Sequence, residues 1–565
     1  MGVTMPESRK QQRGAIFVLT MVMLVLCSGL LTAMFLTALS DARASRVDTR
    51  VKTAFSCAES GVEFAATRLR TYAANFMPYP HGGTTTVNGV QVTWGITPAL
   101  DKDGNQIIFN DLAGDDFRTL SKLYLVTANA TFQGARATAQ SYVSLDAIPI
   151  FQFFAFYNKD LEIQPGPEMH IRGRVHTNGS LYTNANNKLY YETGRIRAVG
   201  NFYRHRKDDT SYPGGSVYVG PDNVKVEQWM QTGWKGTYDG EASDFAKMAL
   251  KRFEGQLMTG EHGVSSIEFP SVGNIDPYVP SASGDYSYNS GTGSWDHTPG
   301  SGTHAKGYYH SNAGMTIENG VVRLYGVDIT AQLPAGTVKN TSFYDGRELK
   351  YITVTDVDVK KLSTADVTVN GAVMKAWPDN GLIYTHRTDC SKSQANGIRL
   401  HNAAELPTKT TFISPNPVYI RGDYNSTNKK GSAVISDAVN FLSNSWSDSR
   451  APGTKPNASS TTYNLAMISG NYETKVGKYN GGLENLPRFN ENWTGDNCNL
   501  KVSFVNIWES RYALGAWGGS YYSPPIRNWY FDEDFLDPDK LPPYTPNVFV
   551  VRTIAWWSTE RTRIR

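Results

Sequence analysis

The amino-acid sequence predicts an α+β protein: a long N-terminal helix, a small antiparallel sheet and then a large mainly-β domain. Residues Ala15 to Leu39 contain no charged side chain, and the segment after them keeps a helical spacing of apolar residues. The remainder of the 565 residues contains most of the 51 Gly, 31 Tyr and 27 Pro, a composition that favours short strands joined by turns.

The uncharged segment is long enough to cross a membrane. Its length of roughly 25 residues rises about 37 Å as a helix, more than the hydrocarbon core of a bilayer. The polar leader before it carries Arg9, Lys10 and Arg13, and positive charge holds that end in the cytoplasm. A cleaved secretory signal has a shorter apolar region. We therefore expect a single-pass membrane protein, with an ordinary signal anchor followed by a linker helix as the alternative.

The predicted helix continues beyond the membrane. Apolar residues recur at alternating steps of three and four, a seam that repeats near 3.5 residues. Charged residues such as Arg43, Asp48 and Glu59 lie between them and solvate the other face. The seam consists of Ala44, Val47, Val51, Ala54, Ala58, Val62, Ala65, Leu69, Ala73 and Phe76.

Two motifs in this region resemble those of the PilX-like minor pilins of type IV pili. Gln11-Gln12-Arg13-Gly14 directly before Ala15 resembles the end of a prepilin leader, and Ala58-Glu59-Ser60-Gly61 resembles the "A-E-x-G" signature of those pilins. The resemblance implies leader cleavage between Gly14 and Ala15 by a prepilin peptidase and methylation of the new amine. It also implies anchoring in a bacterial inner membrane, with the C-terminal domain periplasmic or on an extracellular filament. The implied partners are other pilin or pseudopilin subunits.

One position departs from the pattern of major pilins. Most of them carry a Glu five residues into the mature chain, whereas this chain has Leu19. PilX-like proteins and the K-type pseudopilins of type II secretion also lack that Glu. The departure indicates a minor subunit, at a filament tip or the cell surface, rather than one that polymerises into a shaft.

The chain divides into five predicted segments. Two hairpins follow the helix, with turns at Asn88-Gly89 and Gln133-Gly134-Ala135. The segments are a leader at 1–14, a transmembrane helix at 15–39, a pilin-like helix and antiparallel sheet at 40–147, a β-rich part at 151–440, and an aromatic-rich part of the same domain at 441–565.

The large domain is predicted to be a β-solenoid, or parallel β-helix, with a β-sandwich as the alternative. Its short extended runs are separated by Gly, Asn and Pro, which suits rungs that stack short parallel strands. Gly173–Tyr182 and Asn380–His386 have similar sequences, typical of repeated rungs. Helices are predicted only at Val224–Gly233 and Glu241–Gly255.

The sequence contains no motif of a known catalytic site, so we predict no enzyme activity and no cofactor. The 55 basic and 52 acidic residues make no basic field for nucleic acid. Five features could carry chemistry, but for each of them the structural interpretation is favoured, and we predict no metal site. A calcium-like sequence is expected to be a plain turn, four histidines that could bind a metal are expected to line turns, and an acidic pair that polysaccharide cleavage could use is expected to be a solvated loop. A cysteine pair could form a disulfide, and a Trp-rich region from Phe441 onward could stack on sugars but is expected to fill the interior of the domain. In the same order these are Asp101–Asn105; His170, His176, His386 and His401; Asp208 and Asp209; Cys390 and Cys498; and Trp446, Trp493, Trp508, Trp517, Trp529, Trp556 and Trp557.

Three functions are open on this evidence. The first is a structural minor pilin of a type IV pilus-like system. The second is a K-type pseudopilin, although the extra domain of that family is mainly helical. The third is a membrane-tethered protein that binds or cleaves polysaccharide, which requires carboxylates gathered in one groove.

Overall fold

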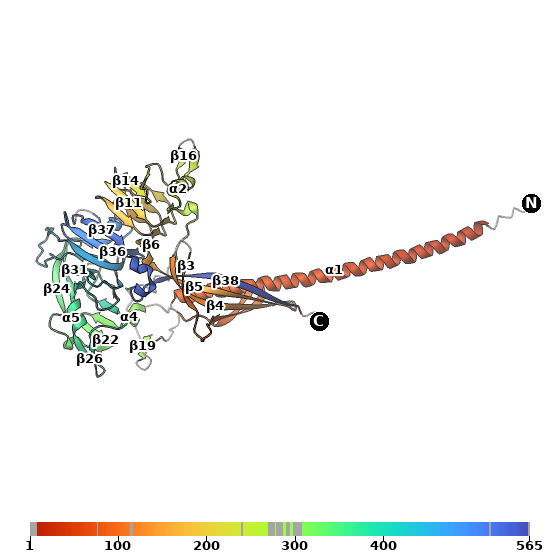
Figure 1. Ribbon diagram of the computed structural model, residues 1–565, viewed down its shortest axis with the longest axis horizontal. Coiled ribbons are helices and arrows are strands. Elements are labelled where there is room, and N and C mark those ends of the chain that lie inside the picture. The colour runs from red at the N-terminus through yellow and green to blue at the C-terminus, as the bar shows by residue number, and fades with distance from the viewer. Residues whose placement is uncertain are drawn as a thin grey trace, which may run out of the picture.

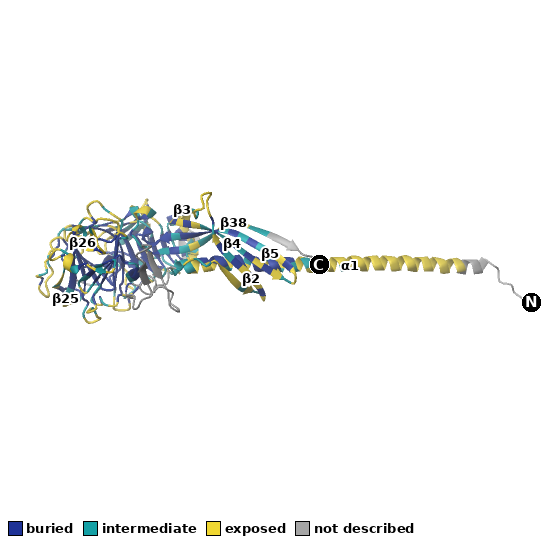
Figure 2. Ribbon diagram, turned by 90° about the horizontal axis from the view of Figure 1, so that it is seen from below, coloured by how far each residue is buried: buried dark blue, intermediate teal, exposed yellow. Residues whose placement is uncertain are grey.

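A long helix extends from a sheet and a strand-rich domain (Figure 1). The computed structural model describes residues 8–75, 77–113, 117–238, 241–268, 277, 286–289, 294–297, 308–518 and 521–562. The helix α1 (Ser8–Ala74) has 67 residues and rises about 100 Å. Its first half is exposed, and from Val51 onward one face is buried (Figure 2). Because the helical spacing of apolar residues continues without a break, the exposed part and the packed part belong to one continuous helix.

The sheet beside α1 is antiparallel, with strands in the order β1-β2-β4-β5-β38 and β3 paired to β4. The two predicted hairpins are confirmed. Asn88 and Gly89 have φ of 49° and 78°, and Gln133 and Gly134 have φ of 47° and 89°, the left-handed backbone that tight hairpin turns require. The strands are β1 (Gly82–Val87), β2 (Val90–Pro98), β3 (Ile108–Ala113), β4 (Phe117–Phe132), β5 (Ala135–Pro149) and β38 (Asn547–Thr562).

The predicted seam of α1 packs on this sheet. Its buried members are Val51, Ala54, Ala58, Val62, Ala65 and Leu69, whereas Ala44 is exposed, Val47 and Ala73 are half-buried, and Phe76 lies outside the described residues. Gly61 makes the closest approach, because a Cβ there would lie 2.5 Å from Val92 Cγ1 and 2.9 Å from Ala128 Cβ. The glycine of the "A-E-x-G" signature thus allows helix and sheet to touch. We call the half of α1 from Val51 onward, together with this sheet, the stem.

The large domain is built from ladders of parallel strands. Rungs repeat along the chain: β6, β7 and β8 are followed by β9, β10 and β11, and then by β12, β13 and β14, and each strand pairs in parallel with its counterpart on the neighbouring rung. These strands are β6 (Ala155–Tyr157), β7 (Leu161–Ile163), β8 (Met169–Arg172), β9 (Val175–Thr177), β10 (Leu181–Thr183), β11 (Lys188–Thr193), β12 (Ile196–Ala198), β13 (Phe202–Tyr203) and β14 (Ser216–Val219).

The longest ladder joins two arcs of the chain. Its order is β21-β28-β30-β32-β34-β36-β6-β9-β12-β18, and the strands β25, β29, β31, β33 and β35 form a second ladder beside it. The chain therefore enters in the middle at β6, winds to one end at β18, and starts again from the opposite end at β21. It then winds back to β36, which pairs with β6.

These ladders include β18 (Leu257–Met258), β21 (Met315–Glu318), β25 (Lys350–Asp358), β28 (Leu382–His386), β29 (Gly397–Ala403), β30 (Thr410–Ser414), β31 (Val418–Tyr424), β32 (Ser432–Ser436), β33 (Val439–Leu442), β34 (Thr461–Ser469), β35 (Pro487–Phe489) and β36 (Asn497–Asn506). Parallel stacking of this kind fits the predicted solenoid, because the sheets of a sandwich are antiparallel.

Shorter elements decorate the ladders. They are β15 (Val224–Val226), β16 (Lys235–Tyr238), β17 (Glu241–Asp244), β19 (Tyr286–Asn289), β20 (Ser294–His297), β22 (Val321–Leu324), β23 (Val327–Asp328), β24 (Val338–Asp345), β26 (Asp366–Val369), β27 (Ala372–Lys375), β37 (Ile526–Phe531), α2 (Phe245–Phe253), α4 (Tyr308–Asn312) and α5 (Val359–Thr364). Of the two predicted helices, Glu241–Gly255 is helical only over α2, because Glu241–Asp244 is the strand β17 and pairs with β16. The prediction at Val224–Gly233 is wrong, since Val224–Val226 pairs with β14.

The domain boundary predicted at the C-terminal end is also wrong. We expected residues 441–565 to belong wholly to the large domain, but β38 returns to the stem and pairs with β5 from Asn547↔Pro149 to Thr562↔Ala135. Arg552 of this strand contacts the buried Asp146 and lies 2.6 Å from Asp111. Two adjacent strands, β5 and β38, therefore connect the large domain to the stem.

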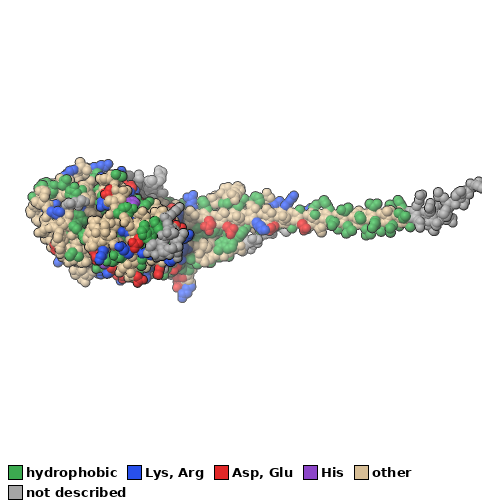
Figure 3. Space-filling model, turned by 90° about the horizontal axis from the view of Figure 1, so that it is seen from above, with side chains coloured by type: hydrophobic (Ala, Val, Ile, Leu, Met, Phe, Trp, Pro, Cys, Tyr) green, Lys and Arg blue, Asp and Glu red, His purple; other side chains and the backbone are tan. Residues whose placement is uncertain are grey.

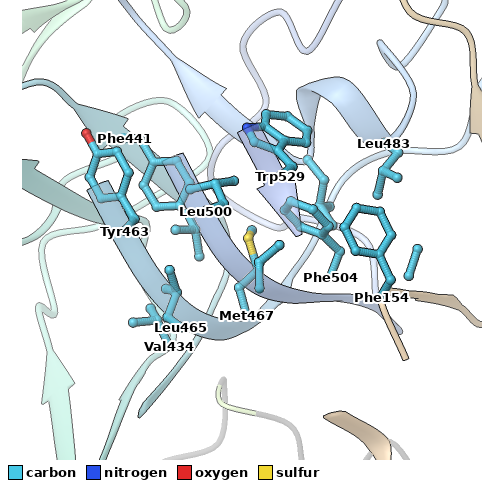
Figure 4. Packing of buried hydrophobic residues seen from close by; sticks show 14 of the residues in the cluster. Phe154, Val434, Phe441, Tyr463, Leu465, Met467, Leu483, Leu500, Phe504 and Trp529 are labelled. Atoms are coloured by element: carbon cyan, nitrogen blue, oxygen red, sulfur yellow. The ribbon is translucent and has the colours of Figure 1, made fainter. Parts of the chain in front are cut away.

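The interior of the large domain is filled by aliphatic and aromatic side chains. In Figure 4, Phe441 lies against Tyr463, and Phe504 lies beside Trp529. The ring centroids of these two pairs are 4.2 Å and 5.4 Å apart. All four side chains are almost fully buried.

Candidate functional site

The first candidate site is the exposed apolar half of α1. Large apolar side chains from Ile16 to Leu36 are 51–69% exposed, and Figure 3 shows hydrophobic side chains along the outer part of the helix on the face in view. Among the described residues, one helix is long and apolar enough to cross a membrane, with a mean hydropathy of 2.5 over its most apolar window. Exposing so much apolar surface to water is unfavourable. We therefore expect this part of the helix to be covered by a membrane or by the apolar surface of a partner.

The predicted cleavage position lies on this exposed part of the helix. Gly14 and Ala15 are both exposed, and a Cβ placed on Gly14 would have nothing within 4 Å. Leu19 is 66% exposed. Cleavage between Gly14 and Ala15 stays a prediction, since accessibility alone does not show that a peptidase cuts there.

The second candidate site is a small polar cleft on the large domain. Its enclosed volume is about 20 Å³, enough for one water-sized group. Glu162 of β7 is 2% exposed, lines the cleft, and has its Oε2 atom without a hydrogen-bond partner. The other lining residues are Asn158, Lys159, Asp160, Lys207, Asn471, Glu473, Thr474, Asn480, Asn506, Ile507, Trp508 and Glu509.

Ion pairs hold the walls of the cleft together. Lys207 Nζ lies 2.7 Å from Asp160 Oδ2 and 2.9 Å from Glu473 Oε1, and Lys159 contacts Glu509. The segment 471–482, which carries Glu473, covers the outer side of β7 and is also tied down by a hydrogen bond from Gly477 N to the Asp208 carbonyl oxygen. This cover explains why Glu162 is buried although its neighbours Leu161 and Ile163 face the interior.

Burial raises the pKa of Glu162 to about 7, while Thr474, Lys207 and Arg206 oppose the rise and Asp208 adds to it. Burial also raises the pKa of Glu484 to about 7, with Arg527 as the main opposing charge. Both carboxyls exert a charge effect on the buried Tyr157. The region is therefore one where carboxylic acids stay partly protonated near neutral pH.

The acidic pair predicted as a cleavage candidate lies beside the cleft but does not line it. Asp208 Oδ1 accepts a hydrogen bond of 3.0 Å from Arg206 Nε, and the Asp209 carboxylate accepts one of 2.9 Å from Ser211 N. These contacts match a self-compensating turn. The carboxylates that line the cleft are others, Asp160, Glu162, Glu473 and Glu509.

The predicted histidines lie in separate surroundings. His170 stacks on Tyr190 with centroids 4.6 Å apart, and His176 stacks on Phe156 at 5.3 Å. Burial lowers the pKa of both His386 and His401. In the part of the chain that the structure describes, no group of three or more His, Cys, Asp or Glu side chains is placed to hold a metal ion.

The calcium-like sequence at Asp101–Asn105 forms a plain turn. Asp101 Oδ1 accepts hydrogen bonds of 2.9 Å from the backbone N–H of Asp103 and of Asn105, so the carboxylate closes its own turn.

The cysteine pair is not bridged. Cys390 and Cys498 do not form the disulfide that the sequence allowed, and both thiols are free. Burial raises the pKa of both thiols.

The expectation that the Trp-rich region fills the interior is confirmed for five of its tryptophans. Five of its tryptophans are at most 8% exposed, and a buried ring presents no face to a ligand; they are Trp446, Trp493, Trp508, Trp517 and Trp529. Trp556 is 44% exposed, and Trp557 donates a hydrogen bond to Gln140, but both belong to β38 in the stem. The large domain uses most of these rings as core.

Sequence reasoning missed the cleft. Its walls come from β7, from the loop at Lys207 and from segments near 473 and 509, and Lys207 and Glu473 are 266 residues apart. The nearest sequence signal was the basic and acidic run from Arg204 to Asp209. That run lies next to the cleft without forming its base.

Comparison with known proteins gives little. No family model matches this chain, and no curated protein matches it. Among solved structures, the competence-associated pilin ComZ from Thermus thermophilus is similar at 12% identity and a TM-score of 0.29, with 91% of this chain and 98% of that chain covered. A similarity with so low a TM-score supports no conclusion about the fold or the function of this chain.

Proposed function

We propose that this protein is a membrane-anchored structural subunit of a type IV pilus-like filament system, a minor pilin that displays the large domain outside the cytoplasm. The observation that carries the proposal is the division of α1 into two halves. The segment Ala15–Leu39 has no charged side chain and is largely exposed, and the part of α1 from Val51 onward packs one apolar face on an antiparallel sheet. A helix of this kind can lie in a membrane and, after assembly, among apolar helices of neighbouring subunits.

The proposed position in the filament is supported by Leu19 and by the size of the large domain. Without an acidic side chain at that position, the subunit lacks the partner for a neighbour's terminal amine that the pilin resemblance implies for shaft subunits. A bulky domain is accommodated most easily where no further subunit stacks above it. Both points support a place at the tip of the filament.

The K-type pseudopilin is less well supported. Its resemblance implies a mainly helical extra domain, whereas α2, α4 and α5 of the described large domain have nine, five and six residues. The described remainder of this domain consists of strands, turns and short 3-10 segments.

The proposal is tested at the N-terminus of the protein purified from membranes. Mass spectrometry should find a mature chain that begins at Ala15 with a methylated amine, and Gly14→Val should leave the leader uncleaved. Gly29→Val is the matched control, because both glycines lie on exposed helix with nothing within 4 Å of an added Cβ. An intact Met1 in the wild-type protein, or a cut beyond Leu39, would contradict the pilin assignment.

A further inference from the structure

Glu162 presents a buried acceptor atom that the described protein does not use. The Glu162 side chain lines the cleft beside Thr474, and its Oε2 atom is buried with no hydrogen-bond partner. A buried carboxylate oxygen without a partner is costly, so natural proteins rarely leave one unless a water or a ligand reaches it. The cleft volume of about 20 Å³ admits one such group.

The charges around the cleft favour a cationic donor. Four carboxylates line it, from Asp160, Glu162, Glu473 and Glu509, against the ammonium groups of Lys159 and Lys207. Both lysines are already engaged with carboxylates of the walls. A primary ammonium is about the size of a water molecule, carries three N–H donors, and makes charge-assisted hydrogen bonds to carboxylate oxygens.

Two tyrosine rings lie on the strands next to Glu162, outside the residues that line the cleft. Tyr182 pairs with Glu162 across the parallel strands β10 and β7, so its side chain lies next to Glu162 on the outer side of the ladder. Tyr203 stacks on Tyr182 with ring centroids 4.8 Å apart, and both rings are half-buried. Flat aromatic rings beside polar groups suit the apolar face of a sugar ring, and a lysine side chain has no such flat face.

We propose that this site, the Glu162 cleft with Tyr182 beside it, binds an amino sugar of a glycan. The free amine of the sugar enters the cleft and donates to Glu162 Oε2, and the sugar ring lies toward Tyr182. The inference goes beyond the role of the stem and does not depend on it, because every residue it uses lies in the large domain. It involves binding only, with no bond broken or formed.

The test is isothermal titration calorimetry of the full-length protein in detergent. The probes are a β-1,4-linked glucosamine dimer, its N-acetylated counterpart, cellobiose, and an end-blocked tripeptide with a central lysine. The glucosamine dimer should bind at least about tenfold more tightly than either sugar without a free amine, the size of one charge-assisted hydrogen bond. Equal binding of the free and acetylated dimers overturns the proposal. Binding of the lysine peptide as tight as that of the glucosamine dimer overturns the choice of a glycan.

Paired variants locate the site. Glu162→Gln should weaken binding of the glucosamine dimer by about tenfold or more, since a neutral amide replaces the charged acceptor. Glu491→Gln is its control, because Glu491 is equally buried but accepts from Ser443 N and Oγ away from the cleft. Unchanged affinity in Glu162→Gln, with an unchanged melting temperature, overturns the proposal.

A second pair of variants tests whether the sugar ring contacts Tyr182. Tyr182→Ala should weaken binding of the glucosamine dimer by about fivefold, in line with the energy of an aromatic contact. Tyr190→Ala is the control: Tyr190 stacks on Tyr218 at 4.8 Å in the neighbouring ladder, away from the lining of the cleft. Equal losses in the two variants would mean that Tyr182 acts through the fold, and the part of the proposal that places the sugar ring on Tyr182 would then be wrong.

Discussion

The stem and the large domain fill their interiors with side chains of different size. The stem core contains Ala54, Ala58, Ala128 and Ala139, and at Gly61 the helix approaches the sheet too closely for a Cβ. The large domain instead stacks aliphatic residues in ladders and closes them with Trp, Tyr and Phe rings. Close approach leaves the stem no room for added volume, whereas the large domain depends on volume that truncation would remove.

The largest predicted effect is the loss of a ring from the large domain. Trp529→Ala should lower the free energy of unfolding by about 3–5 kcal/mol, because it leaves a cavity among fully buried neighbours. Trp556→Ala in the stem should have a much smaller effect, since Trp556 is 44% exposed and Trp529 is 1% exposed. Urea unfolding followed by tryptophan fluorescence measures both. Similar losses in the two variants would contradict the contrast between core and surface rings.

The next effect is a dependence of stability on pH that belongs to the large domain. Burial raises the pKa of Glu162, Glu484 and Glu491 to about 7. A carboxyl with a raised folded pKa gives stability that is present below its unfolded pKa near 4.5 and is lost as the pH rises through 7. Each acid can account for about 3 kcal/mol of that loss.

Glu484→Gln should therefore reduce the loss of stability between pH 5 and pH 8, measured as the shift in the urea midpoint. Glu473→Gln is the control of opposite sign, because the hydrogen bond from Lys207 holds the pKa of Glu473 below its usual value. That variant should leave the loss in place. A wild-type protein that gains stability over this pH range would show that these acids are ionised in the folded state.

A smaller effect, confined to the stem, is expected for added volume or charge on the seam of α1. Gly61→Val should cost about 1–3 kcal/mol through overpacking against Val92 and Ala128. Ala58→Asp places a charge on the fully buried face and should also impair subunit assembly. Circular dichroism should still show a folded large domain in both variants. Normal assembly with charges at Val51, Ala58 and Val62 together would mean that the helix is only a stalk.

The stem and the large domain also differ in how much of each the sequence could predict. The hairpins at Asn88-Gly89 and Gln133-Gly134 and the seam of α1 were predictable, because each signal lies within a few residues. The return of β38 was not: Asp146 and Arg552 are 406 residues apart, and no local pattern names the partner of an edge strand. The cleft was not predictable for the same reason, since Glu162 is buried only where the distant segment 471–482 packs beside it.

The smallest predicted effect is that of reducing agent on the large domain. The sequence allowed a disulfide between Cys390 and Cys498, but both are free thiols, and Cys498 packs inside the ladder core against Trp529 and its neighbours. A thiol that behaves as a small apolar side chain gives the same stability with or without dithiothreitol. The melting temperature should therefore not change on adding dithiothreitol, and alkylation after unfolding without reductant should label both thiols in a mass spectrum.

Two serine variants sharpen this prediction. Cys390→Ser, at the less buried of the two cysteines, should lower the melting temperature by less than Cys498→Ser, because only the second variant puts a hydroxyl into a fully buried apolar position. If reductant lowers the melting temperature of the wild type but not of Cys390→Ser, the two cysteines do pair in the native protein, and the ladders around them pack differently from the arrangement described.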